Sequence, residues 1–457
     1  MKDYTLTPTP ENILESFSRD ILGRNNDIFR FIKLLDSFNS CRSIALNGGW
    51  GSGKTFFVKQ AKLIWDSYNP NSAVDSGIRA QIKSLYADES QCRSDITTAY
   101  YDAWENDNDT DPIISLLYAT VTDSNAEYKP ESERSLAETL TSIFDAVTNK
   151  DMTSVYKSLK GEDPFYRIRA AKSINSLVND FIEFLIEERG NRLVFFIDEL
   201  DRCKPEYAVK LLERVKHFFN NQRVTFVFSV NLEQLQHTVS NYYGKSFNSS
   251  RYLDKLFDLR IRIPECDQEK FIRSKFSFLN SRYIYHNMCI NSACYFHLSL
   301  REIERYMAIM EIIVNERIYT SAYSGFSEEM AVSFCVLYIV PFMVALNICD
   351  LTSYSEFITG NNFEIIEDYL LTQDPSKFEY LLDNDEKFIN TTRGNIEKEI
   401  DLSSKLRRVY DAVFSYKPVG KHYVINIGHL EFNEEVVSDI QRIDTLLSGY
   451  TVFDDQQ

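Results

Sequence analysis

The octapeptide GGWGSGKT (Gly48–Thr55) carries the residues whose types and spacing most clearly indicate chemistry. It fits the pattern G-x-x-x-x-G-K-[ST], in which backbone N–H groups wrap a polyphosphate and glycine tolerates the conformations that this requires. We predict that Lys54 contacts the β- and γ-phosphates of ATP and that Thr55 offers its hydroxyl to Mg²⁺. The other predicted nucleotide contacts in this stretch are Gly48, Gly49, Trp50, Gly51, Ser52, Gly53 and Phe56.

A second motif supplies the acids that such a loop needs. The run LVFFIDELDRC ends an apolar segment with Asp198, followed directly by Glu199. We predict that Asp198 is the acidic partner of Mg²⁺ and that Glu199 is the base that polarises the attacking water. An acid at the end of an apolar run can also be a solvated cap, so this prediction depends on the Lys54 loop.

A third position, Asn231, follows the apolar run VTFVFSV. In a sheet with the phosphate loop and the acidic strand as neighbours, the tip of this strand lies near the γ-phosphate, where Asn231 could orient the water or sense the phosphate. Asparagine is also a good N-cap for the LEQLQHTV helix that follows, and the two roles are compatible.

Strands and helices that alternate along the chain must position these residues. Continuous apolar strands that alternate with helices predict a parallel sheet covered on both faces, an α/β fold of the P-loop type. The strands are expected at 42–47, 97–104, 192–198, 223–231 and 256–264, with a further uncertain strand at 422–427.

The expected domain organisation follows from these strands. Two helices in residues 1–40 lead into a nucleotide core at 41–264, which carries a polar helical insert at about 106–190. Residues 265–350 are expected to form a helical lid, and 351–457 a mostly helical C-terminal region.

Composition restricts the class of protein. The chain has 457 residues, 44% of them hydrophobic, and a formal charge of −17, which argues against strong nonspecific affinity for nucleic acid but leaves a local basic groove open. Eight scattered cysteines without a C-x-x-C pair, and no apolar N-terminal run, indicate a cytoplasmic protein with reduced thiols.

One segment could overturn the cytoplasmic interpretation. Ala331–Cys349 runs for 19 residues without a charge, which reaches the length of a membrane helix. Pro341 lies near its middle, and no basic residue flanks it directly. We expect a buried helix, or two short ones, of a helical region.

The motifs together resemble the KAP family of P-loop NTPases, a branch of the additional-strand, AAA+/STAND-like ATPases. The resemblance covers roughly residues 15–350. The motifs that carry it are RDILGR (19–24), GGWGSGKT with its tryptophan, YYDAWEND (100–107), FFIDELDRC (195–203), RYLDKLFDLRIRIPE (251–265) and LSLREIERYMAIM (298–310). Trp50 is expected to pack the loop against its surroundings, with Trp104 as a guessed partner.

The resemblance also implies roles for arginines and partners. It implies that Arg24 lies near the base or ribose, that Arg301 or Arg305 reaches the γ-phosphate from the lid, and that Arg202 links the acidic strand to a neighbouring subunit or helix. Arg251 also stands in a family-like position. The REIER segment could equally be an exposed, ion-paired helix face. A homo-oligomer and an effector partner are implied too, as is a role in phage exclusion.

The sequence therefore predicts an Mg²⁺-dependent ATPase that drives or gates a conformational or assembly change. Two alternatives stay open: a nucleotide-gated scaffold or sensor with little hydrolysis, and a DNA-associated motor. The presence of Glu199 favours hydrolysis, and the negative charge counts against the motor.

Overall fold

The structure is a computed structural model that describes residues 7–38, 40–85, 92–123, 178–187, 189–218, 221–275, 283–315, 326–383, 401–415 and 423–451. The chain divides into two compact units, residues 7–267 and 268–457. Most of the predicted insert, residues 124–177, lies outside the described residues.

The first unit is built on a five-stranded sheet. Its strands are β1 (Arg42–Asn47), β2 (Ile96–Asp102), β3 (Arg192–Asp198), β4 (Val224–Val230) and β5 (Leu259–Arg262). All neighbouring pairs are parallel, in the order β2-β3-β4-β1-β5. The predicted α/β parallel sheet is confirmed. β4 lies between the loop strand β1 and the acidic strand β3, which is the additional-strand arrangement.

Alternate residues of each central strand point to opposite faces, as the two-residue period of a strand requires. On β3, Phe195 and Ile197 join one buried core, whereas Val194 and Phe196 join the other. Both faces are therefore covered, and this explains why the central strands read as continuous apolar runs.

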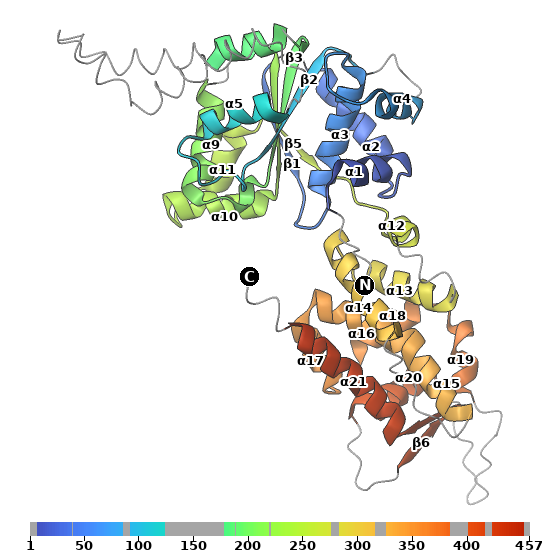
Figure 1. Cartoon of the computed structure of the whole chain (residues 1–457). Helices are drawn as coiled ribbons and strands as arrows, with labels where there is room; N and C mark the ends of the chain where they lie inside the picture. The colour runs from blue at the N-terminus through green and yellow to red at the C-terminus, as the bar shows by residue number, and fades with distance from the viewer. Residues whose placement is uncertain are drawn as a thin grey trace, which may run out of the picture. The chain divides into compact units, whose positions relative to one another are not determined.

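Helices from the N-terminal third cover one face of the sheet (Figure 1). They are α1 (Pro10–Ser18), α2 (Asn25–Asp36), α3 (Lys54–Tyr68) and α4 (Ser76–Leu85). α1 begins where Pro10 fits the first helical turn and where the Thr9 hydroxyl accepts from the Asn12 N–H at 3.3 Å. Phe17, Phe31 and Ile32 of the two leading helices are buried in the same core as Ile44 of β1.

Helices from later in the unit cover the opposite face (Figure 1). They are α5 (Pro112–Asp123), the helical residues 178–187, α9 (Pro205–Phe218), α10 (Leu232–Tyr243) and α11 (Ser249–Leu256). α5 packs on β2 and α9. The described ends of the predicted insert thus belong to the covering layer of the sheet.

The second unit is mostly helical, as predicted for the C-terminal region. Its helices are α12 (Gln268–Lys275), α13 (Tyr283–Tyr295), α14 (Leu300–Asn315), α15 (Phe326–Phe334), α16 (Val340–Cys349), α17 (Leu351–Ile358), α18 (Glu364–Thr372), α19 (Glu379–Leu382), α20 (Leu402–Tyr410) and α21 (Glu434–Thr451). The uncertain strand at 422–427 corresponds to β6 (Val424–Ile427), which forms an antiparallel hairpin with β7 (Leu430–Asn433).

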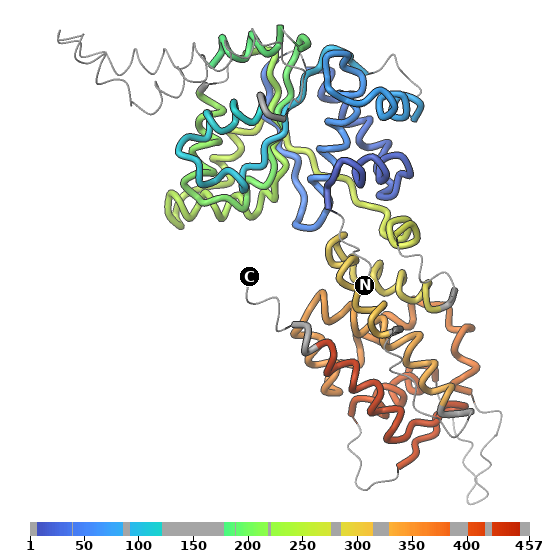
Figure 2. Tube along the Cα trace, in the orientation of Figure 1, coloured from blue at the N-terminus to red at the C-terminus, as the bar shows by residue number. Residues whose placement is uncertain are grey.

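The uncharged segment forms an interrupted helix inside this unit, which the tube in Figure 2 follows in orange. Glu329–Cys349 is the one described helix long and apolar enough to cross a membrane, and 72% of its apolar window is buried inside the protein. A π-helical turn, Cys335–Ile339, separates α15 from α16 just before Pro341. α16 packs against α13, α14, α17 and α21, as the core helix of a soluble unit would.

Candidate nucleotide site

The loop after β1 delivers the N-terminus of α3 to the carboxyl edge of the sheet. Gly53 caps the helix with a φ of 82°, in the left-handed region that glycine adopts without strain. At Gly48 an added Cβ would lie 2.5 Å from a side-chain carbon of Ile263. No side chain caps α3, so its first N–H groups are available to an anion.

Lys54 is folded back on this loop. Its Nζ donates to the carbonyl oxygens of Gly48 at 2.9 Å and Gly49 at 3.1 Å, and its side chain is buried. Burial lowers the pKa of Lys54, while the carboxylates of Asp201 and Asp198 oppose that effect. The Phe56 side chain is buried too, so that residue can offer only its backbone N–H to a phosphate.

Thr55 and Asp198 meet directly. The Thr55 hydroxyl donates to Asp198 Oδ2 at 2.7 Å, and the Tyr100 hydroxyl donates to the same oxygen at 3.1 Å. Asp198 is fully buried, and burial raises its pKa despite the Thr55 hydrogen bond. The structure therefore brings together the two residues predicted to hold Mg²⁺.

The donor set at this point suits a hard cation. A hydroxyl and a carboxylate are oxygen ligands, and Mg²⁺ is commonly held by one or two such groups together with substrate phosphates and water. Among the described residues there is no cluster of three or more His, Cys, Asp or Glu side chains that could hold a metal by themselves. Thr55 and Asp198 thus fit a cation that arrives with a nucleotide.

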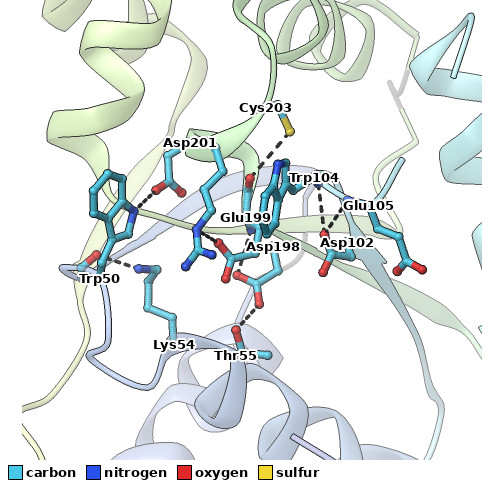
Figure 3. Close-up of polar contacts among 12 residues, drawn as sticks. Trp50, Lys54, Thr55, Asp102, Trp104, Glu105, Asp198, Glu199, Asp201 and Cys203 are labelled. Carbon is cyan, nitrogen blue, oxygen red and sulfur yellow. Dashed lines mark hydrogen bonds and ion pairs between the residues drawn. The ribbon is translucent and has the colours of Figure 1, made fainter. Parts of the chain in front are cut away.

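Glu199 follows Asp198 and sits beside it in Figure 3. Its backbone has a φ of 59°, which is uncommon for a non-glycine residue and turns the chain sharply at the end of β3. Burial, supported by the neighbouring Asp198 charge and opposed by Arg202, raises the pKa of Glu199 to about 7. A carboxylate with such a pKa is suited to exchange protons near neutral pH.

Arg202 is the ionic partner of Glu199. Its Nε lies 2.5 Å from Glu199 Oε2, and both side chains are about four-fifths buried. Its guanidinium carbon lies 5.4 Å from the centre of the Trp104 ring, a cation–π contact. Within this chain the partners of Arg202 are Glu199 and Trp104, and its link to a neighbouring subunit or helix stays a prediction.

Trp50 lies at the tip of the loop and is half exposed. Its indole Nε1 donates to Asp201 Oδ2 at 2.9 Å, which ties the loop to the turn that carries Glu199. The guessed packing of Trp50 on Trp104 is wrong: the two rings lie on opposite sides of Glu199 (Figure 3). Each tryptophan instead has its own polar partner.

Asn231 serves as the N-cap of α10. Its Oδ1 accepts from the Glu233 N–H at 3.1 Å and the Gln234 N–H at 3.4 Å. Its role at the γ-phosphate stays a prediction.

A cavity of about 430 Å³ opens beside the phosphate loop. Its lining comprises Arg24, Asn47, Gly48, Gly49, Ser52, Asn231, Glu233, Arg262, Ile263, Pro264 and Glu265. Arg24 is buried, and its Nη1 donates to the Ser52 carbonyl at 2.8 Å. The predicted base-side residue therefore contacts the loop itself as well as the cavity.

The remaining predicted arginines belong to two other helices. Arg301 and Arg305 belong to α14 in the second unit, and Arg251 is an exposed residue of α11. Their predicted action on the γ-phosphate stays a prediction.

Two contacts of the site were not predicted from the sequence, although Asp201 is the next candidate for the base after Glu199. The Tyr100 hydroxyl donates to Asp198 and the Trp50 indole donates to Asp201, and both pairs join distant parts of the chain. Tyr100 stands in the YYDAWEND motif and Asp201 in the DELDR motif, so their motifs were visible although their contacts were not.

The comparisons with known proteins agree with this geometry. A family model described as the KAP family P-loop domain matches residues 24–317, more than half of the chain. A comparison with curated proteins found no match. The matched segment begins at the arginine that contacts the loop and includes the loop, the acidic strand and α14. The chain belongs to the KAP family of P-loop NTPases.

Proposed function

We propose that this chain is an Mg²⁺-dependent ATPase. The observation that carries the proposal is the hydrogen bond of 2.7 Å between Thr55 and Asp198 at the N-terminus of α3, with Glu199 next in the chain. The proposal is supported because Thr55 and Asp198, the proposed cation ligands, and Glu199, the candidate base, lie at one edge of the sheet beside a loop suited to phosphates.

Each residue has a defined task in hydrolysis. The loop N–H groups and Lys54 bind the β- and γ-phosphates, for which Lys54 must leave the Gly48 and Gly49 carbonyls that it contacts now. Thr55 and Asp198 would hold Mg²⁺, which supplies charge neutralisation of the phosphate oxygens.

Glu199 accepts a proton from water as the water oxygen bonds to the γ-phosphorus. The bond between that phosphorus and the bridging oxygen of the β-phosphate breaks, and ADP and phosphate are released.

The cavity of about 430 Å³ is our candidate for the base and ribose. Its position beside Gly48 and Ser52 makes it continuous with the phosphate loop, and Ile263 with Pro264 offers an apolar surface for a base. Arg24 supports the loop through Ser52 and contributes a positive charge to the cavity. Adenine is the proposed base because of the family resemblance.

Hydrolysis is proposed to drive or gate a conformational or assembly change in a cytoplasmic homo-oligomer with an effector protein, in defence against phage. These outputs rest on the resemblance alone. A rise in mass by light scattering on addition of ATP, and a specific activity that rises with protein concentration, would support assembly.

A nucleotide-gated sensor with little hydrolysis is the second candidate. The ion pair between Glu199 and Arg202 favours it, because a carboxylate held by a cation is not free to bind water. The two candidates share nucleotide binding and differ in turnover.

Paired substitutions test the proposal. Lys54→Ala is expected to abolish detectable ATP binding because the phosphates lose their buried cation. Glu199→Gln keeps the shape of the side chain and should keep ATP binding. It should slow turnover by about 10²–10⁴-fold, the range of general-base catalysis. Calorimetric titration with ATP and phosphate release under single-turnover conditions measure the two effects.

The matched control is Lys33→Ala, an exposed lysine of α2. If the Lys54→Ala chain binds ATP as tightly as wild type, the loop Gly48–Thr55 is not the phosphate-binding site. Equal turnover in wild type and Glu199→Gln would assign the base elsewhere or, if both are negligible, favour the sensor.

A further inference from the structure

Arg202 stands out because hydrolysis as described above does not use it. It is a largely buried cation in a site that is proposed to bind a polyphosphate, and it contacts the side chain proposed as the base. A buried guanidinium is costly unless it is paired. The pairing of Arg202 with Glu199 therefore needs a different explanation from that of an exposed surface ion pair.

The turn that carries Arg202 is tied to the phosphate loop. The Trp50 indole donates to Asp201 Oδ2 at 2.9 Å, and Asp201 directly precedes Arg202 in the chain. Arg202 therefore lies on a turn that is joined to the loop, and its side chain pairs with Glu199. In the proposed reaction Lys54 and Glu199 border the terminal phosphate, one at its oxygens and the other at the attacking water.

The guanidinium of Arg202 also has N–H donors that are available for further hydrogen bonds. Its Nε faces Glu199, and among the described residues neither Nη group has a hydrogen-bond acceptor. The planar fork of arginine matches two phosphate oxygens at once, which a single lysine ammonium cannot do. The Trp104 ring supports the guanidinium, whose central carbon lies 5.4 Å from the centre of the ring.

We propose that Arg202 is a catalytic residue that acts in cis on the terminal phosphate, and that Glu199 holds its guanidinium until that phosphate arrives. The inference rests on the proposed ATPase function. A terminal phosphate carries more negative charge than one carboxylate, so it competes successfully for the fork. The exchange releases Glu199 to accept a hydrogen bond from water at the moment when a hydrolysable nucleotide is present.

Nucleotide discrimination tests the exchange in the full-length chain. The affinities for ADP and for a non-hydrolysable ATP analogue are measured with Mg²⁺ for wild type, Arg202→Gln and Arg202→Lys. Arg202→Gln should keep ADP affinity within about 2-fold, lose about 10-fold for the analogue, and lose about 10³-fold in single-turnover hydrolysis, as the loss of an arginine at a transferring phosphate predicts. Arg202→Lys should recover only part of both losses.

Trp104 provides a second variant in case Arg202→Gln does not fold. Trp104→Ala keeps the Arg202 charge but removes the aromatic ring that supports it, and it should slow hydrolysis by about 10-fold without changing ADP affinity. Trp104→Phe keeps an aromatic ring and should hydrolyse ATP at a rate close to that of wild type. The matched control is Arg30→Gln on α2, whose side chain is 80% exposed.

The results that would contradict the proposal can be told apart from one another. An unchanged ratio of analogue to ADP affinity in Arg202→Gln, or faster hydrolysis, would reduce Arg202 to a restraint on Glu199 and overturn the proposal. Restoration of turnover when Arg202→Gln and Lys54→Ala chains are mixed would assign the arginine to a neighbouring subunit and overturn the cis assignment. If wild type neither binds nor hydrolyses ATP, the proposed function itself fails, and this inference fails with it.

Discussion

Trp50 shows how one side chain can fix a flexible loop. A glycine-rich loop has high conformational entropy, and the indole N–H anchors its tip to Asp201. Asp201 is buried, and its other oxygen, Oδ1, has no hydrogen-bond partner among the described residues. The tryptophan is therefore explained by a hydrogen bond that holds the loop close to the turn that carries Glu199.

This contact leads to a prediction at the scale of one residue. Trp50→Phe keeps an aromatic ring but leaves a buried carboxylate without its donor, a loss of about 1–2 kcal/mol. Nucleotide affinity should fall by about 5- to 30-fold, measured by titration.

A double-mutant cycle with Asp201→Ala provides the control, because two residues that share one bond give non-additive losses. Additive losses, or full affinity in Trp50→Phe, would contradict this account of the loop.

At the scale of elements, α1 and α2 are part of the nucleotide unit rather than an appendage. Their apolar stripes complete the core on one face of the sheet, next to α3. Arg24, at the N-cap of α2, then reaches the loop from this position. The packing of these two helices thus supports the site directly.

The last residue of α2, Asp36, makes this junction sensitive to pH. It accepts from the Trp65 indole at 3.3 Å, and burial raises its pKa to about 6. In the unfolded chain the carboxyl ionises near pH 4. Between these values the folded chain holds a proton that the unfolded chain has lost, so stability from this group is full below about pH 4 and falls as pH rises to about 6.

Asp36→Asn removes the loss of stability that comes from ionising a buried carboxyl group. Its free energy of unfolding relative to wild type should rise by about 1–2 kcal/mol between pH 4.5 and pH 7. Chemical denaturation at several pH values measures the difference, and Glu11→Gln, at an exposed acid of α1, reports the effect of one charge alone. Parallel pH curves for wild type and Asp36→Asn would show that the carboxyl is not buried at this junction.

At the scale of the whole molecule, the candidate nucleotide site and the uncharged segment belong to different units. The phosphate loop, the acids and the cavity lie in residues 7–267, and Ala331–Cys349 lies in residues 268–457. Most of the apolar surface of that segment is covered by other helices of its own unit. Insertion into a bilayer would require those contacts to be broken.

The full-length chain should therefore stay in the supernatant when expressing cells are fractionated without detergent. A resident membrane protein in the same preparation is the marker for the pellet. Recovery of the chain only from carbonate-washed membranes would contradict the burial of Ala331–Cys349 and restore the membrane interpretation.

The sequence by itself determined the elements of the nucleotide unit. Apolar runs of strand length and the helical period between them predicted all five strands of the sheet, because both signals are local. The loop Gly48–Thr55 and the acid at the end of β3 were also visible, since their chemistry depends on residue types at fixed spacing.

Only the tertiary structure decided which of these residues meet. The order β2-β3-β4-β1-β5 and its parallel register bring Thr55 to Asp198 and Tyr100 to the same carboxylate. Trp50 finds Asp201 rather than Trp104 for the same reason. Local patterns encode what each segment becomes, but contacts between segments depend on strand order, register and side-chain direction, which no single stretch of the chain contains.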